Sequence, residues 1–333
     1  MFRKIIRSGF FIIAFTAVGL IPDKSDAVRY KVLVVMSYHE SMPWVEEVKE
    51  GIDIEIGGEC NLNYFYMDTK RNMEGGPQKA EEAYALYREL QPDGVIAVDD
   101  NAQSMFVVPY LKDKVETPVM FCGVNSKPDK YGYPASNVTG SLERPHIAGS
   151  IAFVQQLVPS IKTFGFIGKD SPTTWSMLKQ IQREAETYPA KLTAYKLPRT
   201  MNEAMTMTGE LKILCDALLI VNIEGVPGED GKPMTKKEVM PVLVKTFGKP
   251  TITDVAKDLR YGILCAIAVT GQEQGSTAAR MLLKAMQGTP VSQIPITQNR
   301  QGRAMINVTV MRALGIKPKP IVLKGIELLK TEE

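Results

Sequence analysis

The sequence has few of the residues on which enzyme and metal chemistry depend. It holds two histidines, His39 and His146, and four cysteines with no Cys-x-x-Cys pair. A multi-histidine metal centre and a zinc or redox motif are therefore excluded. Glycine-rich phosphate-binding motifs, the His-Glu-x-x-His helix and the Gly-x-Ser-x-Gly nucleophile elbow are missing as well. Histidine-based catalysis is left with two candidates, and no cofactor is expected.

An excess of charge of one sign is also lacking. Of 40 basic and 37 acidic residues, four and two lie in residues 1–27, which leaves 36 and 35 in the rest of the chain. A nucleic-acid-binding surface needs a clear basic excess, so no nucleic-acid partner is expected.

Long apolar runs are absent except at the start. The run over residues 9–21 is about thirteen residues, short of the roughly twenty that span a bilayer. Arg3, Lys4 and Arg7 precede it, and Ser25-Asp26-Ala27 fits a signal-peptidase site. Residues 1–27 are therefore predicted to be a cleaved signal peptide, and the mature chain to be periplasmic or otherwise extracytoplasmic.

The four cysteines are Cys60, Cys122, Cys215 and Cys265. An exported protein can form disulfides, and three pairings are open that the sequence does not choose among. The favoured interpretation is that they are small apolar residues near or within strands.

One strand-turn-helix unit, residues 31–51, recurs along the chain. Residues 32–36 form an apolar run typical of a buried strand, residues 37–41 are polar, and a helix follows from Pro43. Further strands are expected at 60–67, 95–98 and 118–122, and in a second series at 164–167, 192–197, 217–221, 251–253 and 263–269. Late strands are expected at 292–297 and 304–308. Helices are expected between them, including 102–111 and 272–287. This alternation predicts two α/β lobes with parallel sheets.

Polar and aromatic residues gather where the strands end. In open α/β sheets ligands bind at that edge, and a site closed between two lobes can bury a small ligand. The first lobe offers Ser37, Tyr38, His39, Trp44, Asp100, Asn101 and Asn125, and the second offers Ser171, Thr174, Trp175, Asn222, Glu224 and Asp254. Glu143, between the lobes, is a further candidate. We expect these residues to bind a ligand rather than to catalyse.

Each candidate also has a structural interpretation. Trp44 and Trp175 are equally compatible with covering the sheet ends, and capping is slightly favoured for Asn101 and Asn222. Glu224 fits an exposed loop residue, and Asp254 a helix cap. Because neighbouring residues of an extended strand point to opposite faces, one of Asp99 and Asp100 is expected to face the cleft.

The opening VMSYHESMPWVEEVKEG resembles the ABC-transporter substrate-binding protein family that includes the tryptophan-binding TrpX-type proteins. So do TPVMFCGVN, VTGSLERPHIAGSIAFVQQLVPSIKTFGFI, GKPTITDV, GQEQGSTAARMLLKAMQGTPVSQIPI and INVTVMRALGI. The resemblance implies a type I periplasmic-binding fold, with two Rossmann-like lobes joined by hinge strands near Glu143, residues 266–271 and residues 295–303. Lobe 1 would hold residues 28–142 and about 268–295, and lobe 2 residues 143–267 and about 296–333.

The resemblance implies a transport role, in which the chain closes on a small polar or aromatic, amino-acid-like ligand and delivers it to an ABC permease. The DDNA and FCGVN segments are closer to a subgroup that also serves as extracytoplasmic sensor domains, so a sensory module for a membrane receptor stays open. A carboxylate such as Asp100 or Glu143 would bind an ammonium group, and helix amides after Ser37 or Ser171 a carboxylate. An exported hydrolase using His39 is the remaining alternative. A monomer is expected.

Overall fold

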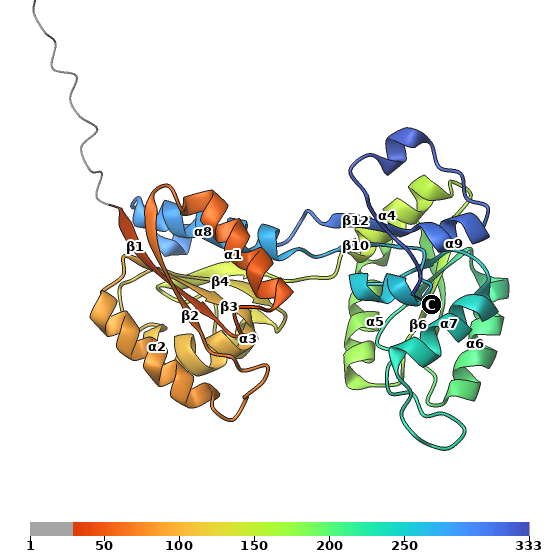
Figure 1. The fold of residues 1–333 in the computed structure, drawn as a ribbon, viewed down its shortest axis with the longest axis horizontal. Helices are drawn as coiled ribbons and strands as arrows, with labels where there is room; N and C mark the ends of the chain where they lie inside the picture. The colour runs from red at the N-terminus through yellow and green to blue at the C-terminus, as the bar shows by residue number, and fades with distance from the viewer. Residues whose placement is uncertain (1–28, 333) are drawn as a thin grey trace, which may run out of the picture.

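The computed structural model describes residues 29–332, so the predicted signal peptide lies outside the described residues. Figure 1 shows two bodies, lobe 1 and lobe 2, joined by slender connections. Each lobe has its own sheet, of six strands in lobe 1 and seven in lobe 2. The predicted α/β class is confirmed.

Lobe 1 is built on a parallel sheet with the strand order β11-β5-β4-β3-β1-β2. Its strands are β1 (Tyr30–Met36), β2 (Cys60–Tyr66), β3 (Gly94–Val98), β4 (Val119–Val124), β5 (Val138–Leu142) and β11 (Thr297–Gln298). Its helices are α1 (Pro43–Ile56), α2 (Gly76–Leu90), α3 (Asp99–Ala102), the π-helix η1 (Gln103–Leu111) and α8 (Gly271–Met286). Helices α1 and α8 pack on one face, and α2 and η1 on the other. The central strands are apolar throughout because both faces are covered.

Lobe 2 has the strand order β13-β12-β10-β9-β8-β6-β7, and only β10 and β12 pair in antiparallel fashion. Its strands are β6 (Thr163–Ile167), β7 (Lys191–Lys196), β8 (Ala217–Ile220), β9 (Thr251–Ile252), β10 (Cys265–Ala268), β12 (Arg303–Asn307) and β13 (Glu327–Leu329). Its helices are α4 (Ile147–Leu157), α5 (Pro172–Glu184), α6 (Met201–Leu214), α7 (Lys236–Phe247) and α9 (Val308–Ala313). Helices α4, α5 and α9 cover one face, and α6 and α7 the other.

The chain crosses between the sheets three times, after β5, after β10 and after β11. Hydrogen bonds tie the crossings together. Asn299 accepts from the backbone N–H of Arg144 at 2.7 Å and donates to its carbonyl at 2.8 Å. Glu273 Oε1 accepts from the N–H groups of Arg300 and Gln301 at 2.6 and 2.7 Å. The expected hinges lie at or beside these crossings, and their bending stays a prediction.

Some elements differ from the sequence-based expectations. The strand expected at 292–297 is replaced by a short 3₁₀ turn, Val291–Gln293, and irregular chain, and strand pairing is confined to Thr297 and Gln298. Pro295 has no N–H to donate to a ladder, which limits pairing there. The helix expected at 102–111 is wound as the π-helix η1, with Pro109 inside it. All four cysteines are free and buried.

Candidate functional site

Asp99 is the most deeply placed carboxylate at the lobe 1 strand ends. It follows β3, is only 4% exposed and has a left-handed backbone with φ of 68°. Trp44 Nε1 donates to its Oδ1 at 3.0 Å, whereas its Oδ2 has no hydrogen-bond partner within residues 29–332. Burial, reinforced by the charge of Glu143, raises the pKa of Asp99 well above its usual range.

Gly123 on the neighbouring strand β4 makes room for this carboxylate. Its φ is 69°, and a Cβ added there would lie 2.7 Å from Asp99 Oδ1. A side chain at this position would thus meet both backbone strain and a clash. The glycine therefore leaves room for the buried Asp99 carboxylate beside Trp44.

Asp100 is engaged within lobe 1. It accepts hydrogen bonds from the N–H of Asn125 at 3.0 Å, the N–H of Ser126 at 3.2 Å and the hydroxyl of Tyr131 at 2.6 Å. Burial alone would raise its pKa, but these hydrogen bonds outweigh burial and lower it. Asp100 therefore anchors the loop after β4.

Glu143 begins the first crossing beside that loop. Asn125 Nδ2 donates to its Oε2 at 3.0 Å. Burial raises the pKa of Glu143 to about 7, against the lowering effect of the Asn125 hydrogen bond. Glu143 thus changes charge near neutral pH at the boundary of the two lobes.

Ser37 and Asn101 make hydrogen bonds within lobe 1, beneath the C-terminal ends of its strands. Ser37 is wholly buried; its hydroxyl donates to the Val98 carbonyl at 2.6 Å and accepts from the Ala102 N–H at 2.8 Å. Asn101 Nδ2 donates to Thr69 Oγ1 at 2.9 Å, and Thr69 Oγ1 in turn donates to the Ser37 carbonyl. The placement of Ser37 differs from the expected ligand contact, because the hydroxyl is fully used inside the lobe.

Tyr38 and His39 lie above this framework and are partly exposed. The Lys70 ammonium sits 5.5 Å from the centroid of the Tyr38 ring. His39 Nδ1 is buried without a hydrogen bond among the described residues and is 3.5 Å from Asp68 Oδ1.

The residues that follow the strands of lobe 2 make fewer hydrogen bonds to one another than their counterparts in lobe 1. Ser171 caps α5, accepting from the Thr174 N–H at 3.3 Å, and the two hydroxyls lie 2.9 Å apart. Trp175 is 41% exposed and donates from Nε1 to Asp170 at 2.8 Å. Capping explains Ser171 and Thr174, and Trp175 does not cover the end of the sheet.

Asn222 and Asp254 end the neighbouring strands β8 and β9. Asn222 has φ of 45°, and its buried Nδ2 has no partner within residues 29–332. The buried Asp254 Oδ1 is likewise without one, and burial raises the pKa of Asp254 to about 6. Glu224 is exposed in the loop beyond.

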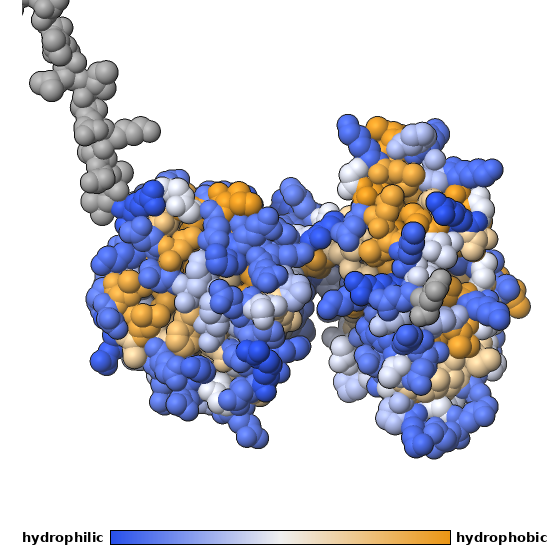
Figure 2. Space-filling view, in the orientation of Figure 1, coloured by the Kyte–Doolittle hydropathy of each residue, from blue (hydrophilic) through white to orange (hydrophobic). Residues whose placement is uncertain are grey.

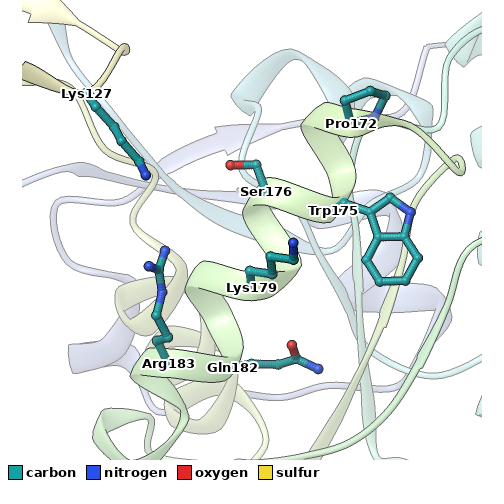
Figure 3. A pocket seen from close by; sticks show the side chains of 7 residues that line it. All are labelled: Lys127, Pro172, Trp175, Ser176, Lys179, Gln182 and Arg183. Carbon is teal, nitrogen blue, oxygen red and sulfur yellow. The ribbon is translucent and has the colours of Figure 1, made fainter. Parts of the chain in front are cut away.

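Two adjoining cavities lie between the loop after β4 and helix α5. One, of 480 Å³, reaches Glu143, and the other, of 730 Å³, reaches Trp175. Both are lined by Lys127 of lobe 1 and by Ser176 and Arg183 of α5. Figure 3 shows Lys127 and Arg183 approaching the second cavity from opposite sides. Within the described part of the chain, no group of acidic, histidine and cysteine side chains is arranged to hold a metal ion.

Sequence reasoning considers both Asp99 and Asp100 and takes Asp100 as the candidate, whereas the structure buries Asp99 beside Trp44. The alternation argument assumed an extended chain through Asp99 and Asp100, but the positive φ of Asp99 starts α3 directly. Alternation does not apply there: Asp99 is buried beside Trp44, and Asp100 accepts hydrogen bonds from the loop after β4. The signal that the sequence offered for this position was the pair of aspartates directly after a predicted strand.

The fold, with polar strand ends on two facing lobes, is that of a bilobal ligand-binding protein. The chain belongs to the ABC transporter substrate binding protein family, whose model matches residues 109–327. No curated protein matches the chain by sequence. In the described residues, no helix is long and apolar enough to cross a membrane.

Solved structures show the same fold. The ligand-free, open structure of CD0873, a substrate-binding protein with adhesive properties from Clostridium difficile, has a TM-score of 0.72 at 16% identity, covering 91% of this chain and all of that one. The ABC domain in complex with L-Trp from Streptococcus pneumonia has a TM-score of 0.53 at 17% identity. The match covers 90% of this chain and 100% of that one. The predicted type I periplasmic-binding fold is confirmed, and this family is one of binding proteins rather than enzymes.

Proposed function

We propose that this chain is the extracytoplasmic binding component of an ABC transporter and closes its lobes on a small polar or aromatic, amino-acid-like solute. The observation that carries this proposal is that buried polar atoms at the strand ends of both lobes have no hydrogen-bond partner within residues 29–332. These atoms are Asp99 Oδ2 in lobe 1, and Asn222 Nδ2 and Asp254 Oδ1 in lobe 2. Leaving such an atom unpaired costs about 1–3 kcal/mol, so a solute that supplies partners to both lobes would favour closure.

The solute binds lobe 1 first in this proposal, because that half of the site is already fixed by internal hydrogen bonds. Asp99 and Glu143 take an ammonium group, whose positive charge lowers their raised pKa values and favours the ionised carboxylates. Trp44 and Tyr38 provide aromatic surface. Asp100 is excluded from this role by its three hydrogen bonds within the lobe. Asn222 and Asp254 of lobe 2 then complete the contacts, and Lys127 and Arg183 meet a carboxylate at the cleft edge. The L-Trp bound to a structure of the same fold supports an amino-acid-like ligand.

The transport role rests on the family. The partner is then a membrane permease, and the location is outside the cytoplasm. Neither the sensory alternative nor the hydrolase predicted from His39 is favoured by a separate observation in the structure. Transport by this chain with its permease in vesicles would separate the carrier from the sensor.

Calorimetry tests the binding proposal directly. Protein unfolded and refolded to remove any copurified solute is titrated with aromatic and aliphatic amino acids, and with matched compounds lacking the ammonium or the carboxylate. We expect a Kd in the micromolar range for at least one amino acid, and at least tenfold weaker binding when the ammonium is missing.

The matched variants are Asp99→Asn and Asp129→Asn. Asp99 is the buried carboxylate beside Trp44, whereas Asp129 is exposed and its side chain makes no hydrogen bond or ion pair within residues 29–332. Asp129→Asn should bind normally and Asp99→Asn weakly. If no amino acid binds, or if both variants bind like the parent, the proposed ligand class is wrong.

A further inference from the structure

Residues 312–330, near the end of the chain, form a tip on lobe 2 that exposes apolar side chains. After α9, residues 314–326 run through the 3₁₀ helix η6 (Pro320–Leu323) and return as β13. Ile321 is 72% exposed there, and Leu328 of the edge strand is 56% exposed. Figure 1 shows this dark blue segment at the upper extremity of lobe 2, and Figure 2 shows orange atoms bordered by blue over the same region.

Cations surround this tip, and their charges are not neutralised within the protein. Among residues 29–332, no ion pair involves the five cations of the segment, which are Arg312, Lys317, Lys319, Lys324 and Lys330. The one acid within residues 312–330, Glu327, is paired with Arg303, and Glu332 just beyond them is paired with Arg260. The segment therefore presents a local positive charge on a chain that is nearly neutral elsewhere.

The tip is convex and conformationally restricted. Pro318 and Pro320 flank Lys319, and each proline fixes one backbone angle, which lowers the entropy lost when the tip is immobilised. The cavity that Lys324, Gly325 and Ile326 line faces α1 and α8, and Ile321 is not among its lining residues. A protruding aliphatic side chain among lysines fits a flat surface better than it fits a peptide in a groove.

We propose that this tip, residues 312–330, docks on an anionic membrane surface. The cations would lie at the level of anionic lipid headgroups, and Ile321 would enter the interface between headgroups and acyl chains. Each lysine near such a surface adds to the attraction, and a shallow apolar insertion adds to it further. Contact of this kind would keep the binding protein close to the membrane without a spanning helix.

Vesicle flotation tests this proposal. The chain is used as residues 28–333, which contain both complete sheets and lack the apolar run at residues 9–21 that would itself bind lipid. Vesicles of phosphatidylcholine alone are compared with vesicles containing phosphatidylglycerol. We expect binding to the anionic vesicles only, falling steeply between low and physiological salt.

Variants locate the contact. Lys317→Glu combined with Lys319→Glu should weaken binding to anionic vesicles by roughly tenfold or more, and Ile321→Ser by a smaller factor. The matched controls are Lys245→Glu combined with Lys257→Glu, and Ile213→Ser. These lysines are exposed, and Ile213 is 85% exposed on α6, away from the tip.

Thermal unfolding and solute affinity are measured on every variant and should be unchanged, so a failure here is separate from a failure of the proposed solute binding. Equal binding to neutral and anionic vesicles, or anionic binding that the control variants weaken as much as the tip variants, would overturn the proposal. So would an absence of vesicle binding, the result expected if the true partner is an acidic protein surface.

Discussion

The two lobes share an architecture but differ in how their strand ends are held. In lobe 1, Asp100, Asn101 and Asn125 are hydrogen-bonded to neighbouring segments, although four buried atoms have no hydrogen bond within residues 29–332: His39 Nδ1, Asp99 Oδ2, Ser141 Oγ and Glu273 Oε2. In lobe 2, Asn222 and Asp254 have unpaired atoms, Glu224 is exposed, and Trp175 is held at the surface by Asp170.

This difference indicates unequal roles. A network that is already fixed loses little entropy on binding, whereas side chains that must be ordered cost about 0.5–1.5 kcal/mol each. Lobe 1 is thus suited to select the solute, and lobe 2 to complete the enclosure. Each experiment below tests this difference between the lobes.

The largest expected effect is on affinity, from the carboxylates. Asp99→Asn should weaken solute binding about a hundredfold and Asp254→Asn about tenfold, because a charge-assisted hydrogen bond is worth more in the better fixed and more deeply buried site. Calorimetry on both variants, with Asp129→Asn as control, measures this ratio. Equal losses would mean that the lobes do not differ in selecting the ligand.

The next largest effect is expected on stability, when either tryptophan is replaced by alanine. Trp44→Ala should lower the free energy of unfolding by about 2 kcal/mol and also weaken binding, because Trp44 is partly buried against the sheet and bonded to Asp99. Trp175→Ala should cost less than about 1 kcal/mol, since that residue is 41% exposed and lies outside the core of lobe 2.

Chemical denaturation and ligand titration separate the two roles of Trp44. Loss of stability with normal affinity would make Trp44 a cover of the sheet only, and loss of affinity with full stability would make it a wall of the cleft only. Trp44→Phe, which keeps an aromatic ring but removes the hydrogen bond to Asp99, is the matched variant.

Glu143 should give the protein a distinctive pH dependence. Its pKa of about 7 in the folded state exceeds the ordinary value of 4.5, so the folded state binds more protons between these values. Its contribution to stability therefore falls as pH rises from about 4.5 to 7 and stays low above that. Glu143→Gln should remove this fall, which makes the variant more stable than the parent by roughly 2 kcal/mol at pH 8 and similar to it at pH 4.

Melting curves of parent and variant across this pH range measure the effect. Two curves that run parallel would show that Glu143 keeps an ordinary pKa. The lobe boundary would then lack a group that titrates near neutral pH.

The smallest expected effect concerns the connection between the lobes. Glu47 of α1 accepts from Arg303 of β12 at 2.5 Å and from the Gly271 N–H at 2.9 Å, which links lobe 1 to two crossings. Glu47→Gln should change stability by about 0.5 kcal/mol and affinity by less than threefold, because the pair is partly exposed. A larger change in affinity would show that this contact, and not only the two half-sites, sets the balance between open and closed forms.

The sequence determined the layout of the molecule. The apolar run at residues 32–36, the polar residues after it and the helix from Pro43 follow from local periodicity, as do most later units, and strand ends in a parallel sheet must lie on one edge. The bilobal fold and the list of edge residues could be predicted on that basis.

Only the tertiary structure decided which edge residues are available to a ligand. Ser37 and Asp100 have the same side-chain chemistry as good ligand contacts, but distant partners, Ala102 for the first and Tyr131 for the second, use their hydrogen-bonding groups. Asp99 was hidden because its left-handed backbone and the space above Gly123 depend on a neighbouring strand. Periodicity encodes which face a residue lies on, whereas the satisfaction of its polar atoms depends on contacts between residues far apart in the chain.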